Sequence, residues 1–89
     1  MHITAELSLY PLDREYIPLI KRFIGALQSH TNLDIVVNQM STQVSGDFSA
    51  VTGAINQAMR ECLSGPERAA LVVKYLNTSL PIATAPDLD

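Results

Sequence analysis

The chain has 89 residues, a formal net charge of −3 and hydrophobic residues at 47% of its positions. This length predicts one small domain with a thin core, because such a chain buries only about 60–65% of the surface that its unfolded form exposes. The acidic balance and the absence of any Lys/Arg cluster argue against nucleic-acid binding, and no apolar run approaches the roughly 20 residues of a membrane span.

Residues 2–10 are predicted to form a strand, because apolar and polar side chains alternate strictly before Pro11. A helix is expected next. It begins near Glu15 or Tyr16, so that Pro18 lies in the first turn where a missing N–H costs little, and it ends between residues 29 and 32. Its predicted apolar face recurs at helical spacing and consists of Ile17, Ile20, Phe23, Ile24 and Leu27.

Two short strands, residues 33–38 and 41–45, are predicted to form an antiparallel hairpin that turns near Gln39 and Met40. A second helix follows, with Asp47 as its N-cap, and it ends at Leu63 before the sequence SGPE. Residues 69–76 form the last predicted strand. The predicted apolar face of the second helix consists of Phe48, Val51, Ile55, Met59 and Cys62.

The order strand, helix, strand, strand, helix, strand predicts an α+β protein with the ferredoxin-like βαββαβ plait. In this fold a four-stranded antiparallel sheet carries two helices on one face. The domain is expected to span residues 1–77, and residues 78–89 form a C-terminal tail that we expect a neighbouring subunit to hold. Residues 69–76 are apolar on both sides, so the sequence does not specify which side of this strand is buried.

The sheet face without helices, here called the open face, is predicted to mix apolar and hydrogen-bonding side chains. Such a face either packs on a second subunit or lines a pocket for a small polar ligand. A third reading leaves Glu6 solvated or paired with Lys74. If Leu33, Ile35 and Val37 are the buried set of the second strand, and the set with Leu71 and Val73 is buried in the last, the open face carries Glu6, Ser8, Val36, Asn38, Gln43, Val72 and Lys74.

Two motifs at a fixed separation carry a family resemblance. Ser8-Leu9-Tyr10-Pro11-Leu12 ends the first strand, and Ser41-Thr42-Gln43-Val44-Ser45-Gly46-Asp47 leads into the second helix. With them, roughly residues 3–76 resemble the YkoF-related thiamine/hydroxymethylpyrimidine-binding family, part of a superfamily of ferredoxin-like thiamine-binding proteins. The resemblance implies non-enzymatic binding of thiamine or its hydroxymethylpyrimidine moiety, in transport, salvage or sensing.

The resemblance also implies a set of ligand-binding residues in and beside the two motifs. A carboxylate can accept from the exocyclic amine of an aminopyrimidine, hydroxyls and amides can satisfy the other polar atoms, and a tyrosine can stack on the ring or on a thiazolium cation. The candidates are Glu6, Ser8, Tyr10, Asn38, Ser41 and Thr42.

The sequence predicts a binding protein that pairs with itself. YkoF-type members often carry two repeats in one chain, whereas this chain carries one, and only 17% of its residues are charged. Both features favour a homodimer or a larger homo-oligomer. The single cysteine and the lack of a signal-peptide pattern favour the cytoplasm. The alternative is an oligomeric interaction or regulatory module with no small-molecule ligand.

No catalytic or metal site is predicted. His2 and His30 lie far apart and have no Cys or acidic partner at ligand spacing, and no acid–base constellation is present. Cys62 lies on an apolar helix face, so it is expected to be a buried structural thiol. We therefore expect no enzyme activity, no metal and no cofactor other than the bound ligand itself.

Overall fold

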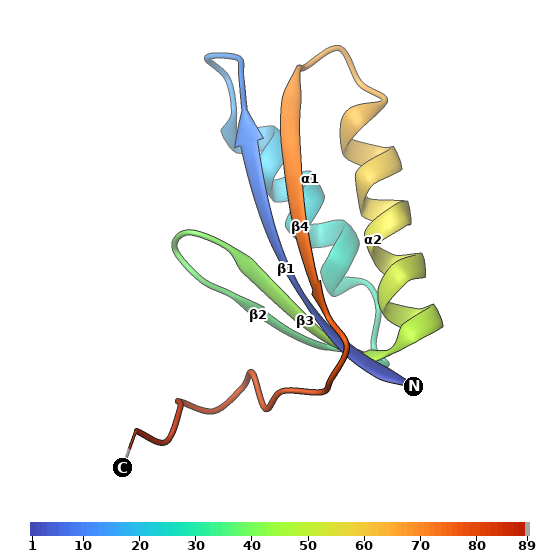
Figure 1. Cartoon of the computed structure of the whole chain (residues 1–89). Helices are drawn as coiled ribbons and strands as arrows, with labels where there is room; N and C mark the ends of the chain where they lie inside the picture. The colour runs from blue at the N-terminus through green and yellow to red at the C-terminus, as the bar shows by residue number, and fades with distance from the viewer. Residues whose placement is uncertain (89) are drawn as a thin grey trace.

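The computed structural model describes residues 1–88 and contains four strands and two helices. The elements are β1 (His2–Pro11), α1 (Ile17–Gln28), β2 (Asp34–Val37), β3 (Thr42–Asp47), α2 (Phe48–Leu63) and β4 (Ala69–Leu76). The strands form one antiparallel sheet in the order β2-β3-β1-β4, and both helices cover the same face of it (Figure 1). The predicted α+β ferredoxin-like plait is confirmed.

The boundary between β3 and α2 differs from the prediction. The strand continues to Asp47, because His2 and Ile3 pair with Asp47 and Gly46 and so extend the ladder. The predicted N-cap is nevertheless present, since the carboxylate of Asp47 accepts a hydrogen bond from the Ser49 N–H at 3.1 Å. A β-carbon at Gly46 would lie 2.6 Å from Leu33 Cδ2, so this glycine allows β3 to approach the start of β2 closely.

The buried faces of both helices are rotated relative to the predicted faces. In α1 the core side chains include Leu19, which was missed, whereas Ile17 is 55% exposed. In α2 the side chains of Phe48 and Met59 lie outside the core, at 45% and 37% exposure. The two helices contact each other as well as the sheet. The buried face of each helix therefore includes alanines, which are Ala26 in α1 and Ala54 and Ala58 in α2. The core positions are Leu19, Phe23, Ala26 and Leu27 of α1, and Val51, Ala54, Ile55, Ala58 and Cys62 of α2.

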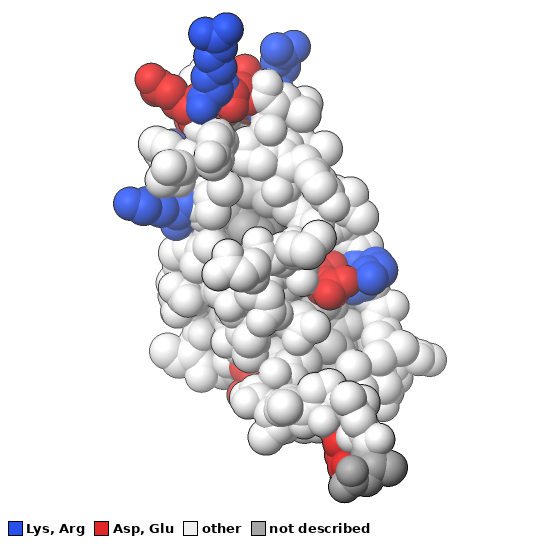
Figure 2. Space-filling view, turned by 90° about the vertical axis from the view of Figure 1, so that its left-hand side faces the viewer, with Lys and Arg blue, Asp and Glu red and all other residues white. Residues whose placement is uncertain are grey.

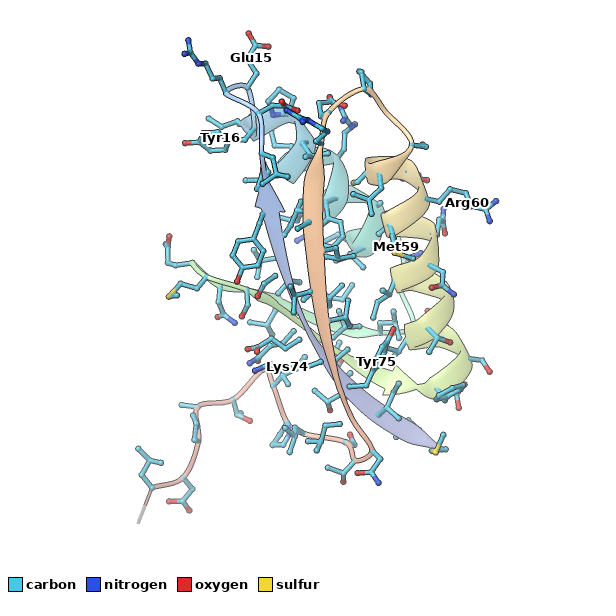
Figure 3. All side chains as sticks on the ribbon, turned by 45° about the horizontal axis from the view of Figure 1, so that its top comes forward. Glu15, Tyr16, Met59, Arg60, Lys74 and Tyr75 are labelled. Atoms are coloured by element: carbon cyan, nitrogen blue, oxygen red, sulfur yellow. The ribbon has the colours of Figure 1, made fainter. Side chains whose placement is uncertain are left out.

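The structure also determines which side of β4 faces the helices. Leu71 and Val73 pack against the core, so Val72 and Lys74 lie on the open face. Figure 3 shows Lys74 and Tyr75 pointing to opposite sides of the strand. Neither helix of the described chain has the length and apolar character needed to cross a membrane.

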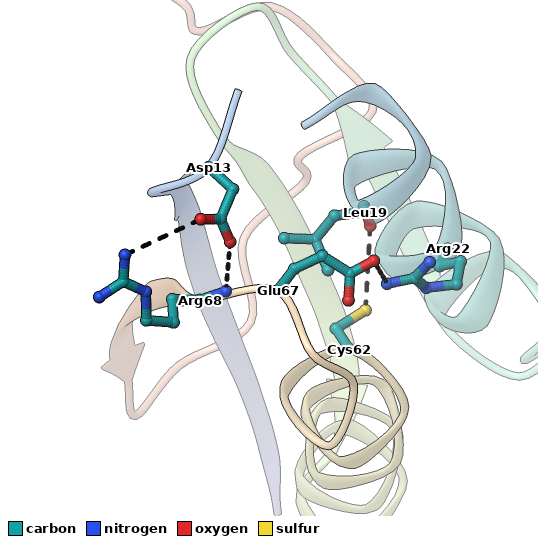
Figure 4. Close-up of polar contacts among 6 residues, drawn as sticks. All are labelled: Asp13, Leu19, Arg22, Cys62, Glu67 and Arg68. Atoms are coloured by element: carbon teal, nitrogen blue, oxygen red, sulfur yellow. Dashed lines mark hydrogen bonds and ion pairs between the residues drawn. The ribbon is translucent and has the colours of Figure 1, made fainter. Parts of the chain in front are cut away.

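Polar contacts connect the loop between α2 and β4 to α1 and to the loop between β1 and α1 (Figure 4). Arg22 of α1 pairs with Glu67 at 2.8 Å, and the Arg68 N–H donates to the Asp13 carboxylate at 2.7 Å. Cys62 is buried beside them, with its Sγ 4.0 Å from the Leu19 carbonyl oxygen. Burial raises the pKa of the Cys62 thiol, which is therefore protonated at neutral pH, as expected for a structural thiol.

Candidate functional site on the open sheet face

One row of side chains crosses the open face through Glu6. The strand register places Glu6 of β1 directly between Gln43 of β3 and Lys74 of β4, and Val36 of β2 lies beyond Gln43. Residues directly opposite each other in a ladder point to the same side of a sheet, so these four side chains form a continuous row. The predicted membership of the open face is confirmed for this row.

Glu6 is held in place by two partners. One carboxylate oxygen lies 2.7 Å from Lys74 Nζ, and the other accepts a hydrogen bond from Ser41 Oγ at 3.1 Å. The hydrogen bond from Lys74, followed by that from Ser41, lowers the pKa of Glu6, which is therefore ionised at neutral pH. The Glu6 side chain is 32% exposed and the Lys74 side chain 76% exposed, so solvent reaches this ion pair.

A cavity of about 1100 Å³, here called the face cavity, lies over this row. One wall is the sheet and the other is the C-terminal tail, which leaves the end of β4 and extends sideways below the β2–β3 hairpin in the view of Figure 1. The sheet contributes most of the polar side chains, whereas most of the tail residues are apolar and only Thr84 and Asp87 among them are polar. The lining residues are Thr4, Ala5, Glu6, Asn38, Gln43, Lys74, Tyr75 and Leu76 from the sheet and hairpin, and residues 80–87 from the tail.

The beginning of the tail is attached to its own chain. Thr4 Oγ1 donates to the Thr78 carbonyl oxygen and accepts from the Leu80 N–H, each at 3.0 Å, and Ser79 Oγ lies 3.4 Å from Ser45 Oγ. We expected a neighbouring subunit to hold this segment. In the structure its first residues are bound by polar side chains of the open face of the same chain, and a contact with a neighbouring subunit stays a prediction.

Charged side chains are unevenly distributed over the molecule. Seen from the side away from α2, they gather at one end, and the broad middle of this side is mostly uncharged (Figure 2). The small number of charged residues, six basic and nine acidic, allows such a large uncharged area.

The structure brings together three of the six candidate ligand-binding residues. Glu6 and Asn38 line the face cavity, and Ser41 reaches it through its hydrogen bond to Glu6. Ser8 lies on the same face one row away, opposite Val72, and does not line the cavity.

Tyr10 and Thr42 do not join this group. Tyr10 lies two rows from Glu6, opposite Ala70, and its side chain is 54% exposed. Thr42 pairs with Leu7, whose side chain is in the core, and Thr42 is itself buried. Successive residues of a strand point to opposite faces, so Thr42 lies beneath the helices, whereas Gln43 lines the face cavity and Ser41 donates a hydrogen bond to Glu6. Thr42 therefore lies on the other side of the sheet from Glu6.

Three polar side chains of the cavity, and the tail, were missing from the candidate set. Gln43 and Lys74 carried a usable signal, since alternation already placed them beside Glu6 on the open face. Thr4 carried the same signal, but nothing in the sequence indicated that its hydroxyl binds the tail. The tail itself has no hydrophobic periodicity that would predict a position on the sheet.

Elsewhere in the described chain we searched for a second ligand cavity and for a metal site. A second cavity of about 110 Å³ lies between the β2–β3 hairpin and α1, and it is too small for a pyrimidine ring with its substituents. Within residues 1–88, no three His, Cys, Asp or Glu side chains form a group that could hold a metal ion.

No protein-family model matches the sequence, and no curated protein matches it significantly. Solved structures do share its fold. A hypothetical protein from Methanocaldococcus jannascii is 22% identical with a TM-score of 0.74, and the match covers 88% of this chain and 81% of that one. A domain of unknown function, DUF77, from Bacillus cereus is 16% identical with a TM-score of 0.74, over 92% of this chain and 84% of that one.

A third similar structure carries a functional description. It is a protein from Thermotoga maritima that is assigned provisionally to thiamine biosynthesis or salvage. It is 16% identical to this chain with a TM-score of 0.72, and the match covers 97% of this chain and 90% of that one. At these identities the three similarities establish the ferredoxin-like fold of the chain.

Proposed function

We propose that this chain binds thiamine or its hydroxymethylpyrimidine moiety in the face cavity without chemically converting it. The observation that carries the proposal is the ionised carboxylate of Glu6, which lines the cavity together with the amide side chains of Asn38 and Gln43. An aminopyrimidine presents an amine donor and ring-nitrogen acceptors, which a carboxylate and side-chain amides complement. The thiamine biosynthesis or salvage description of the Thermotoga maritima protein supports this ligand class.

The ion pair with Lys74 leaves Glu6 able to accept further hydrogen bonds. A carboxylate has about four lone-pair positions, and the contacts with Lys74 and Ser41 use two of them. The pair is open to solvent, so a ligand amine can approach Glu6 without displacing a buried partner. The net charge of −3 also favours a cationic ligand such as the thiazolium of thiamine.

The proposal places the chain with the YkoF-related family as a single-repeat member. We propose a carrier, salvage or sensing role rather than an enzymatic one, because the cavity offers a hydrogen-bonding carboxylate and amides but no nucleophile activated by a base. The fold shared with DUF77 is consistent with this placement.

We further propose that two copies associate through their open faces. Val72 and Leu76 point away from the core on this face, and they are 52% and 43% exposed. Exposed apolar side chains next to a cavity are typical of an interaction surface. The same observation favours the second candidate function, an oligomeric interaction or regulatory module that has no small-molecule ligand.

Calorimetric titration and thermal shift with hydroxymethylpyrimidine, thiamine and thiamine phosphates test the first candidate. Binding of these compounds, and no binding of the same pyrimidine without its exocyclic amine, would support recognition through Glu6. A protein that binds none of them and yet runs as a dimer in light scattering would favour the interaction module. A monomer at micromolar concentration would contradict the proposed association.

A further inference from the structure

The backbone of the tail is attached to the open face at the buried hydroxyl of Thr4, and a side-chain contact between Ser79 and Ser45 lies beside it. Thr4 is 6% exposed, and its Oγ1 accepts from the Leu80 N–H and donates to the Thr78 carbonyl oxygen. The two bonds fix successive parts of the tail backbone to a single atom in the middle of the sheet. Thr4 lies two residues before Glu6, so the anchor and the carboxylate share one strand and one face.

The segment beyond the anchor has local structure of its own. The Ile82 N–H donates to the Leu80 carbonyl oxygen at 2.9 Å, and both the N–H and the hydroxyl of Thr84 bond to the Pro81 carbonyl oxygen, at 3.1 and 2.9 Å. Pro81 has a fixed φ angle, which further limits the conformations of this turn. The anchor and the turn together direct residues 80–87 along the cavity.

The sheet alone does not enclose a ligand. A small-molecule site usually buries about 70–90% of the surface of its ligand, whereas one face of a sheet contacts only one side of a planar ring. Residues 80–87 supply the opposite wall of the face cavity. Ligand enclosure by this chain therefore depends on the position of the tail.

We propose that residues 78–87 form the second wall of the binding site and that Thr4 is the positioning residue that sets this wall. The inference rests on the proposed function and specifies which part of the chain completes the site. The sheet wall recognises the polar edge of an aminopyrimidine through Glu6, and the tail wall covers the apolar face of the ring with Leu80, Pro81 and Ile82. Thr4 itself acts through the tail.

The test uses Thr4→Val in the full chain. Valine keeps the β-branched shape for the strand but can make neither hydrogen bond to the tail. We expect amide hydrogen exchange at Leu80 to become roughly ten-fold faster without ligand, and the affinity for hydroxymethylpyrimidine to fall roughly five- to ten-fold. Thr4→Ser retains the hydroxyl and should restore both values. Thr52→Val removes an equivalent hydroxyl bond on α2, away from the cavity, and should change neither.

A second variant approaches the same bond from outside the sheet. Leu80→Pro removes the donor N–H as well as the leucine side chain and leaves β1 unchanged, whereas Leu80→Ala removes the side chain alone. Leu80→Pro should therefore weaken ligand binding more than Leu80→Ala does, even if Thr4→Val disturbs folding. Unchanged Leu80 exchange in Thr4→Val would overturn the anchor. Faster exchange with unchanged affinity would overturn the tail as a wall while the proposed function stands. Absence of binding by the unmodified protein would instead overturn the proposed function, and this inference with it.

Discussion

Substituting Glu6 with glutamine separates a ligand-binding carboxylate from a purely structural one. The change keeps the size of the side chain and an acceptor for Ser41, which lies 3.1 Å away, but it removes the charge that faces Lys74 at 2.7 Å. It also replaces one acceptor oxygen by an NH₂ group, which repels the exocyclic amine of an aminopyrimidine. The perturbation therefore acts on ligand recognition and on one ion pair, and on little else.

The two effects should differ greatly in size. Lys74 is 76% exposed, and an ion pair open to solvent contributes little to stability, so the melting temperature should change by no more than a few degrees. The loss of a charge-assisted hydrogen bond to the ligand should weaken binding roughly ten- to a hundred-fold. Calorimetric titration with hydroxymethylpyrimidine and a thermal melt measure both quantities on the same sample.

Glu61→Gln is the matched control for this experiment. Glu61 is an exposed carboxylate on α2 that accepts a hydrogen bond from Gln57 at 3.3 Å and does not line the face cavity. Its substitution should leave affinity unchanged. If Glu6→Gln lowers the melting temperature strongly and leaves affinity unchanged, Glu6 is a structural partner of Lys74. If it changes neither, Glu6 contributes to neither binding nor stability, and the reasoning from the face cavity is refuted.

Three further predictions test the electrostatics of the site and the corrected core. Lys74→Met should raise the pKa of Glu6 toward its ordinary value of 4.5, because the hydrogen bond from Lys74 is the largest cause of the lowered pKa. The same variant should bind the thiamine cation more tightly in calorimetry, and weaker binding would contradict this prediction. Folding lowers the pKa of Glu6, so its contribution to stability is complete above pH 4.5 and is lost as the pH falls through its pKa in the folded protein. In thermal melts at acid pH, the melting temperature of Glu6→Gln should therefore depend less on pH in that range than that of the unmodified protein. Leu27→Ala, at a fully buried site, should lower the free energy of unfolding by about 2–5 kcal/mol, whereas Ile17→Ala, at an exposed one, should change it by less than about 0.5 kcal/mol in denaturant melts.

The strands could be predicted from the sequence more accurately than the helix faces. The alternation in β1 allows only one assignment of its buried face. Ile3, Ala5 and Leu7 lie on the same side, and a shift by one residue would bury Glu6. The apolar residues of α1 instead span more than one stripe, so periodicity alone could not decide between Ile17 and Leu19. The contact with α2 and the sheet made that choice, and it depends on residues distant in the sequence.

The candidate site was predicted where strand geometry controls it and missed where the tail does. The row through Glu6, Gln43 and Lys74 follows from period two and from the antiparallel register of the plait. The attachment of Leu80 to Thr4 joins residues 76 positions apart through one hydroxyl, and no local pattern encodes such a contact. A threonine in a strand is ordinary, so its role became visible only in three dimensions.

The motif Ser41-Thr42-Gln43 illustrates how a sequence resemblance and a binding site can differ. Neighbouring residues of a motif suggest one shared site, yet in this strand the side chain of Thr42 is buried, whereas those of Ser41 and Gln43 lie on the open face. Within such a motif, each position is constrained for a different reason: the buried one by packing, the outward ones by the contacts of Glu6. The outward positions of such a motif therefore decide which polar groups the open face presents, and in this chain Ser41 and Gln43 lie beside the ionised carboxylate of Glu6.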